Sequence, residues 1–253
     1  MSQEVDISFI GLMISSSLVF IALALSSYQK LDLGKDMIVS IARAIIQLTL
    51  IGYILEYVFG VDNLFFTSAL LLVIIFNASL NAAKRGTGIK NAFYASFAAI
   101  LTGTSITIFV LVLSGIIKYE AYQIVPVGGM IISNSMIALG LSYRGLLASF
   151  KDKREEIQTK LSLGADIYEA SKVIIRDSIK TGMMPTIDSA KTMGIVALPG
   201  MMTGLILAGV SPLDAIKYQI MVVFMILSTT TISSVIAIFL TYKVFYNERK
   251  QLI

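Results

Sequence analysis

Long apolar segments constrain this chain more than any other feature of its sequence. At 1.5 Å of rise per helical residue, about 20 apolar residues cross the ~30 Å hydrocarbon core of a bilayer. Only helices and closed barrels satisfy their backbone hydrogen bonds in lipid, and the segments lack the alternating polarity of barrel strands. The sequence therefore predicts an all-α, polytopic membrane bundle of about seven transmembrane helices. The predicted spans are residues 7–27, 37–59, 64–82, 92–117, 122–142, 192–210 and 216–242.

Composition supports a membrane protein and excludes several kinds of chemistry. Only 14% of the residues are charged, against about 25% in soluble domains. The chain has neither Cys nor His. Disulfides, His-dependent proton relays, Ser-His hydrolases and imidazole metal sites are therefore excluded. No nucleic-acid partner is expected.

The placement of basic residues predicts the orientation. Of the 20 Lys and Arg residues, 17 fall on one side of the predicted spans, whereas Lys118 and Lys217 fall on the other and Arg43 lies within the second span. The positive-inside rule then places the N-terminus outside and the C-terminus in the cytoplasm of a multi-pass plasma-membrane protein.

One connection, residues 143–191, is long and has a helical pattern. The fifth predicted span is expected to continue into the cytosol, because apolar residues recur after Tyr143 at helical intervals. Leu163, Gly164 and Ala165 interrupt the pattern, Asp166 is placed to cap the next helix, and Pro185 is expected to end it. On spacing alone, this segment is either a docking surface or a solvated loop.

No nucleotide-binding loop is present. A P-loop ends in Gly-Lys followed by Ser or Thr. Gly34-Lys35-Asp36 lacks the hydroxyl residue, and Lys90, after Gly86 and Gly88, has none following it. The chain is therefore not expected to hydrolyse ATP or to be an enzyme.

The sixth predicted span combines a proline with a stripe of small residues. Gly200, Gly204 and Ala208 lie four apart, which lets a neighbouring helix approach closely. Pro199 removes one backbone donor. The pattern indicates tight helix packing or a moving gate, and packing is the commoner explanation.

Polar residues inside apolar spans mark either a translocation pathway or buried hydrogen-bonding pairs. Arg43 needs an anionic ligand or partner, and Asp188 is a candidate for that partner. The methionines, among them Met201, Met202, Met221 and Met225, are read as core filling ahead of a soft-metal track, and no metal site is assigned. The candidate pathway residues are Arg43, Gln47, Asn77, Asn81, Asn134 and Asp188.

The chain resembles a known family of transporters along essentially its whole length. Residues 194–209 (GIVALPGMMTGLILAG) and 215–224 (AIKYQIMVVF) are similar to the permease subunit of FetB-type iron-export ABC transporters. Residues 42–48, 174–179 and 188–192 show the same likeness. The family also includes plant aluminium-tolerance permeases.

The resemblance implies a single transmembrane domain over residues 1–253 that pairs with a second copy and with a cytosolic ATPase, which would carry ATP and Mg. It also implies that residues 143–191 couple the two subunits through Leu163, Gly164, Ala165 and Asp166. Gly164 and Ile174 match the core of the coupling loop of ABC permeases, whereas residues 158–160 and 176–177 depart from its pattern.

Two other kinds of protein remain as alternatives. A seven-helix receptor shares the predicted topology, although Lys217 and Lys243 lie at the ends of the last span and not at the depth of a retinal Schiff base. A secondary transporter usually shows inverted repeats, and none is visible in this sequence.

The orientation can be tested by cysteine labelling, because the chain has no native Cys. A Ser149→Cys variant should be protected from an impermeant thiol reagent in intact cells and should react after the membrane is opened. Labelling of this variant in intact cells would show that the predicted orientation is wrong.

Overall fold

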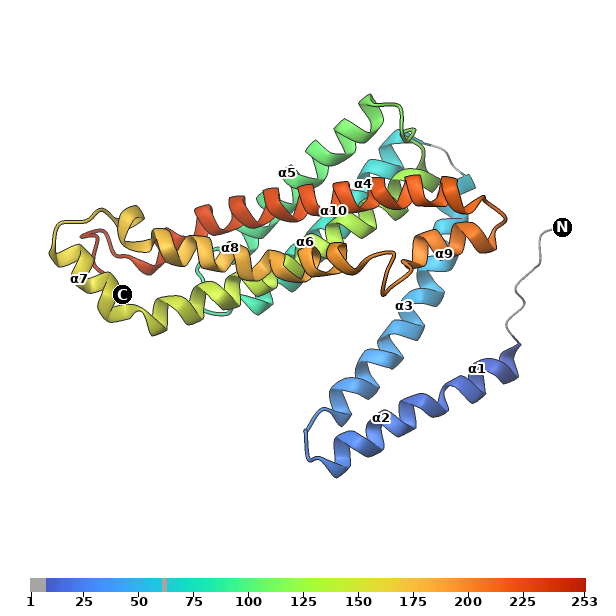
Figure 1. Ribbon diagram of the computed structural model, residues 1–253, viewed down its shortest axis with the longest axis horizontal. Helices are drawn as coiled ribbons and strands as arrows, with labels where there is room; N and C mark the ends of the chain where they lie inside the picture. Colours follow the sequence, from blue (N-terminus) through green and yellow to red (C-terminus); the bar gives the residue numbers. More distant parts are fainter. Residues whose placement is uncertain (1–7, 61–62) are drawn as a thin grey trace. The chain divides into compact units, whose positions relative to one another are not determined.

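The computed structural model describes residues 8–60 and 63–253, and these residues are mostly helical (Figure 1). The all-α prediction is therefore confirmed. Residue 7, where the first predicted span begins, lies outside the described residues. The helices are α1 (Phe9–Ser15), α2 (Ser17–Tyr28), α3 (Gly34–Gly60), α4 (Leu64–Arg85), α5 (Ala92–Leu113), α6 (Ala121–Asp152), α7 (Arg154–Ser162), α8 (Ile167–Thr192), α9 (Gly200–Leu207), α10 (Pro212–Thr241) and the 3₁₀ helix η1 (Tyr242–Phe245).

Six helical segments of the described chain are long and apolar enough to cross a membrane. They match six of the seven predicted spans, so the count of seven is not confirmed. The six segments are Ile10–Tyr28, Gly34–Glu56, Leu64–Arg85, Ala92–Leu113, Ala121–Asp152 and Pro212–Phe245.

The prediction of a continuous sixth span over residues 192–210 is wrong. Helix α8 ends at Thr192, residues 193–199 are not helical, and α9 has only 8 residues, which reach about 12 Å. Gly194 adopts a φ of +84°, a left-handed conformation that ends a helix. Pro199 lacks an amide hydrogen, and it precedes α9 instead of kinking it. Its carbonyl accepts a hydrogen bond from the Thr203 amide at 3.0 Å.

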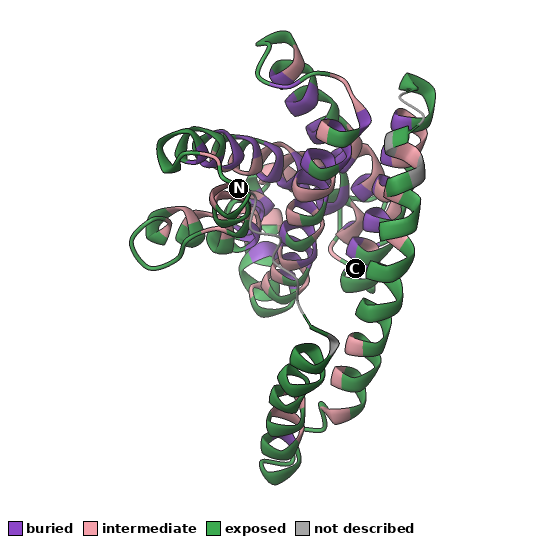
Figure 2. Cartoon of the chain, turned by 90° about the vertical axis from the view of Figure 1, so that its right-hand side faces the viewer, coloured by how far each residue is buried: buried purple, intermediate pink, exposed green. Residues whose placement is uncertain are grey.

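The chain divides into two compact units, of which the first contains α1–α3 and the second most of the rest. Among the described side chains of α1–α3, only Ser26 is buried (Figure 2). In the second unit, α6 packs against α4, α8 and α10, and α10 also packs against α5. Its core includes Ile131, Leu139 and Ile238, all fully buried. The single transmembrane domain over residues 1–253 remains a prediction.

Helices α6 and α8 form a long antiparallel pair. The 32 residues of α6 extend about 48 Å, which exceeds the ~30 Å hydrocarbon core and agrees with the predicted extension of this span beyond the membrane. Helix α8 does not end at Pro185 as predicted but continues to Thr192. A proline inside a helix costs about 3 kcal/mol, and we attribute the continuation to the packing of α8 along α6.

Glycines provide the closest approaches between helices in the second unit. A Cβ atom at Gly182 of α8 would lie 2.5 Å from the backbone oxygen of Ala138 on α6. A Cβ at Gly103 of α5 would lie 2.6 Å from the Ser233 Oγ on α10. Polar side chains reinforce the second contact, because the Ser233 hydroxyl donates to the Ala99 carbonyl at 3.1 Å. These positions are among the close helix contacts of the described chain, whereas Gly200 and Gly204 are not.

We predict that Gly182→Ala destabilises the protein by about 1–3 kcal/mol, the usual cost of overpacking. The added methyl group must displace the α6 backbone at Ala138. Gly129→Ala on α6 is the matched control, because a Cβ there would meet no described atom within 4 Å. Thermal unfolding in detergent should show a lower Tm for Gly182→Ala alone. Equal Tm values would show that the α6–α8 contact is loose.

Candidate functional site

Two adjoining cavities lie beside the interruption between α8 and α9. Their volumes are about 180 Å³ and about 410 Å³. Both are lined by Ala190, Met193 and Val223. The walls come from α6, α8, α9, α10 and the non-helical link of residues 193–199. We refer to the two cavities together as the hollow.

Along α10, which is a candidate membrane span, the link lies about two helical turns from the start of the helix. The Gln219 Nε2 donates a hydrogen bond to the Met193 Sδ at 3.3 Å. Gln219 lies seven residues after Pro212, where α10 begins, and seven residues correspond to about 10 Å. Non-helical backbone at such a depth is tolerated where it is buried in protein or lines an aqueous cavity. The hollow provides such a cavity.

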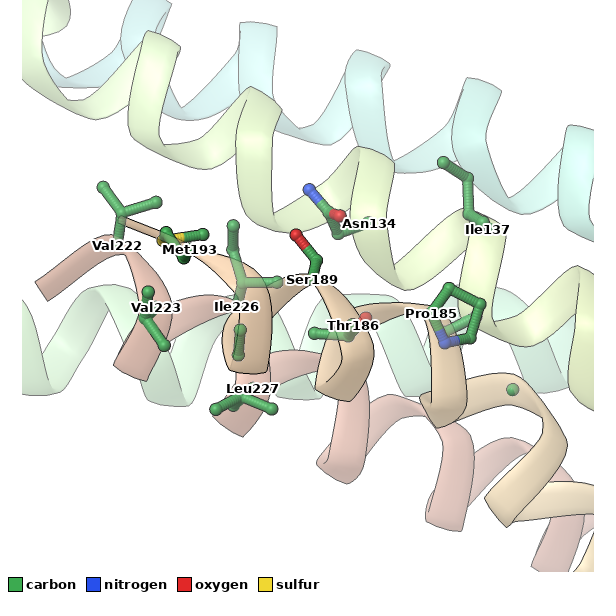
Figure 3. Close-up of a pocket in the computed structure, with 13 residues that line it drawn as sticks. Asn134, Ile137, Pro185, Thr186, Ser189, Met193, Val222, Val223, Ile226 and Leu227 are labelled. Carbon is green, nitrogen blue, oxygen red and sulfur yellow. The ribbon is translucent and has the colours of Figure 1, made fainter. Parts of the chain in front are cut away.

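The hollow is lined by neutral polar groups and thioethers within apolar walls. Figure 3 shows the side chains of Asn134 from α6 and Ser189 from α8 directed toward each other, with Thr186 nearby. The Asn134 amide nitrogen donates to the Met130 carbonyl at 2.8 Å, which leaves its oxygen available. No Asp, Glu, Lys or Arg is among the residues lining the two cavities.

Of the six pathway residues that the sequence suggests, the structure places Asn134 at the hollow. Asn77 and Asn81 are exposed on α4, and their amides bond to carbonyls of their own helix, at 3.5 and 2.9 Å. Arg43 and Gln47 are exposed on α3 in the other unit.

Asp188, the partner suggested for Arg43, forms an ion pair with Lys191 of its own helix at 3.0 Å. Both side chains of this pair are more than half exposed. The two residues Arg43 and Asp188 lie in different units. Their pairing remains a prediction.

The predicted stripe of small residues has no close neighbour among the described residues. A Cβ at Gly200 or Gly204 would meet no described atom within 4 Å, and Ala208 is exposed. Packing of this stripe against another helix, within one copy or between two copies of the chain, remains a prediction. Pro199, at its start, lines the larger cavity.

The turn between α7 and α8 has the geometry that its sequence predicts. Gly164 has a φ of +90°, and the amides of Gly164 and Ala165 donate to the carbonyls of Leu161 and Lys160, each at 3.0 Å. This is the Schellman arrangement that ends a helix at a glycine. Asp166 then caps α8, because its Oδ1 accepts from the Tyr168 amide at 3.2 Å.

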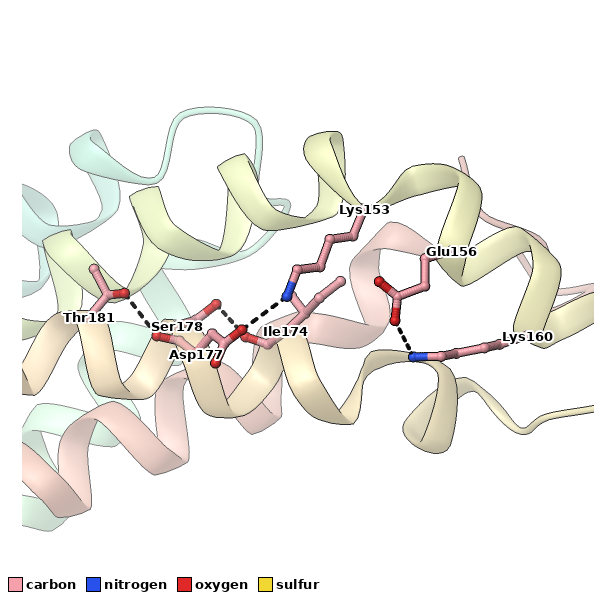
Figure 4. A network of polar contacts seen from close by, with 7 residues as sticks. All are labelled: Lys153, Glu156, Lys160, Ile174, Asp177, Ser178 and Thr181. Carbon is pink, nitrogen blue, oxygen red and sulfur yellow. Dashed lines mark hydrogen bonds and ion pairs between the residues drawn. The ribbon is translucent and has the colours of Figure 1, made fainter.

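Two ion pairs lie on the helices that carry this turn (Figure 4). Lys153, which follows α6, pairs with Asp177 of α8 at 3.0 Å. Within α7, Lys160 pairs with Glu156 at 2.6 Å, and its hydrogen bond and charge lower the pKa of Glu156. Ile157 of α7 is almost completely buried. The turn therefore sits on an ordered helical support.

The segment after α10 lies against the same support. The rings of Phe245 and Phe150 stack with centroids 4.0 Å apart, and the Tyr246 and Ser171 hydroxyls share a hydrogen bond of 2.5 Å. A groove of about 710 Å³ runs between the turn and residues 249–252. Leu163, at the tip of the turn, is 82% exposed.

Comparison with known proteins assigns the family. The model of the uncharacterised protein family UPF0014 matches residues 9–246. The chain belongs to the UPF0014 family. It is 50% identical over 243 residues to the probable iron export permease protein FetB of Escherichia coli, covering 96% of this chain and 94% of that protein.

More distant members of the UPF0014 family come from other bacteria and from plants. The UPF0014 membrane protein YjkA of Bacillus subtilis is 36% identical, covering 96% of this chain and 98% of that protein. Protein ALUMINUM SENSITIVE 3 of Arabidopsis thaliana is 33% identical, covering 92% of this chain and 86% of that protein. No solved structure matched the chain. This UPF0014 member is thus a multi-pass membrane permease, and its resemblance to FetB-type permeases is confirmed.

Sequence reasoning missed most residues of the hollow. Thr186 and Ser189 fall at the end of a segment interpreted as cytoplasmic, and Met193 falls at the start of the predicted sixth span, yet all three line one cavity with Asn134 of α6. Gln219 could have been noticed, because it is a polar residue within an apolar span.

If the hollow admits water, two positions on the same face of α8 should differ in the reactivity of an introduced cysteine. Ser189→Cys should react with a small water-soluble thiol reagent, because thiol reactivity requires access to solvent. Ser178→Cys on the same helix should not react, because Ser178 is fully buried. The vesicles are permeabilised so that the reagent reaches both faces of the membrane. Mass spectrometry then measures the extent of labelling of each variant. An unreactive Ser189→Cys in folded protein would show that lipid or protein fills the hollow.

Proposed function

We propose that this chain is the membrane-spanning permease subunit of an ABC transporter that exports iron. The observation that carries the proposal is the 50% identity, over 96% of the chain, to a protein named as a probable iron export permease. The missing P-loop fits this role, because ATP and Mg would be bound by a separate cytosolic ATPase. A second copy of the chain would complete the pathway.

The turn at residues 163–166 is the proposed docking point for the ATPase. Three features support this role: the exposed Leu163 at its tip, the rigid α6–α8 support beneath it, and the adjacent groove. The groove adds Arg249 and Lys250 from the segment after α10 to the surface. The proposed orientation, with the N-terminus outside, places all of these groups in the cytoplasm, where an ATPase would be.

The hollow is the proposed substrate pathway. It lies where the backbone of a membrane-depth segment is interrupted, which is also where many transporters place their substrate sites. A receptor or a secondary transporter, the two alternatives, would need no ATPase. Copurification of an ABC ATPase with the tagged chain would therefore separate these classes.

We predict that Gly164→Trp leaves the permease in the membrane but abolishes stimulation of the partner ATPase. The bulky side chain would block docking at the turn. Gly115→Trp is the matched control: Gly115 also has a positive φ, +70° against +90°, and open space around it. It lies between α5 and α6, at the opposite end of α6 from the turn.

The assay measures ATP hydrolysis by the reconstituted complex, and ATP-dependent accumulation of radioactive iron in inside-out vesicles. Both activities should be lost in Gly164→Trp and retained in Gly115→Trp. Normal stimulation of ATP hydrolysis by the Gly164→Trp variant would show that this turn is not part of the interface with the ATPase. Stimulated hydrolysis by the unmodified complex without iron accumulation would overturn iron as the substrate.

A further inference from the structure

The side-chain amide of Gln219 is buried, and only one of its two polar atoms has a hydrogen-bond partner among the described residues. The side chain lines the larger cavity, and the residue is only 6% exposed. Its nitrogen donates to the Met193 sulfur at 3.3 Å, whereas its Oε1 has no hydrogen-bond partner among the described residues. Buried polar atoms are nearly always paired in folded proteins. An unpaired amide oxygen at the wall of a cavity therefore points to a ligand that supplies positive charge or a donor.

The methionines of this region fall into two groups. Met221 and Met225 of α10 are buried in the core, with exposures of 8% and 2%. Met193 and Met202, in contrast, are partly exposed and line the same cavity as Gln219. Thioethers are soft donors, and among the described residues that of Met193 is engaged only by the neutral Gln219 amide.

The backbone adds a third reason to expect a cation here. Transporters coordinate cations where a membrane helix is interrupted, because the unwound segment presents groups that a continuous helix would keep paired. On the proposed substrate pathway, residues 193–199 are the corresponding non-helical link, between α8 and α9. Met193 is the first residue of this link, and Gln219 contacts it directly.

We propose that the Gln219 amide oxygen and the thioethers of Met193 and Met202 bind a soft or borderline metal cation stripped of part of its water. Cation binding would satisfy the unpaired oxygen and compete with the Gln219–Met193 hydrogen bond for the sulfur. With neutral donors alone, the site favours reduced ions that accept thioether ligands over hard ions such as Mg²⁺. The role of this ion as the transported substrate rests on the proposed function, whereas its binding does not.

The test measures binding to the purified, full-length permease in detergent, with neither ATP nor ATPase present. The probes are Ag(I), for a purely soft site, and Fe(II) under anaerobic conditions, for a borderline one. Saturable binding of either ion is expected, and Gln219→Leu and Met193→Leu should each weaken it by about 10- to 100-fold or more. Met184→Leu is the control, because Met184 is exposed on α8 and does not line either cavity.

Gln219→Glu keeps the proposal testable if Gln219→Leu folds poorly. A carboxylate at the same position should tighten Fe(II) binding while preserving side-chain size. The site would be overturned if neither Ag(I) nor Fe(II) bound, or if the Met193→Leu and Met184→Leu variants bound the ion with equal affinity. Variant-sensitive binding combined with no ATP-dependent iron transport would retain the site and reject the proposed function. ATP-dependent iron transport without variant-sensitive binding would retain the proposed function and reject the site.

Discussion

The requirement that backbone polar groups be paired inside a bilayer governs this structure. Five of the six membrane-length segments in the described chain contain one uninterrupted helix, and the sixth divides into α1 and α2 at Ser16. Residues 193–199 break the rule, since they are not helical and lie about 10 Å along α10 from its start. Such a stretch needs protein or water around it. The hollow between α6, α8 and α10 follows from this need.

Helix α8 connects the two features on which function is proposed to depend. It starts at the capped turn with Gly164 and ends at the link that lines the hollow. Its 26 residues form a single rod of about 39 Å, held to α6 by the close contact at Gly182 and by the Lys153–Asp177 ion pair. A displacement of the turn would thus be carried along one continuous helix to the link. This arrangement suits a permease whose energy comes from another subunit.

Local chemistry made part of this structure predictable. The extension of α6, the break at Gly164 and the cap at Asp166 follow from apolar spacing and from the conformational preferences of single residues. The continuation of α8 through Pro185 does not, because it depends on packing against α6. For the same reason, Gly182 and Gly103 could not be told from Gly200 and Gly204. All four are glycines in apolar or helical surroundings, and only the fold decides which of them meets a neighbouring backbone.

The neutral lining of the hollow also bears on transport. A carboxylate in the cavity would hold a cation strongly, and a permeation site must bind well enough to admit an ion yet weakly enough to release it. Amide, hydroxyl and thioether groups meet both conditions, since each offers a dipole or a lone pair without a fixed charge. Asp188 shows the contrast: it lies on α8 next to Ser189, yet it pairs with Lys191 and does not line the hollow. The carboxylate of Asp188 is thus paired outside the cavity, and the ion that we propose to bind at Gln219 and Met193 would leave only neutral donors when it is released.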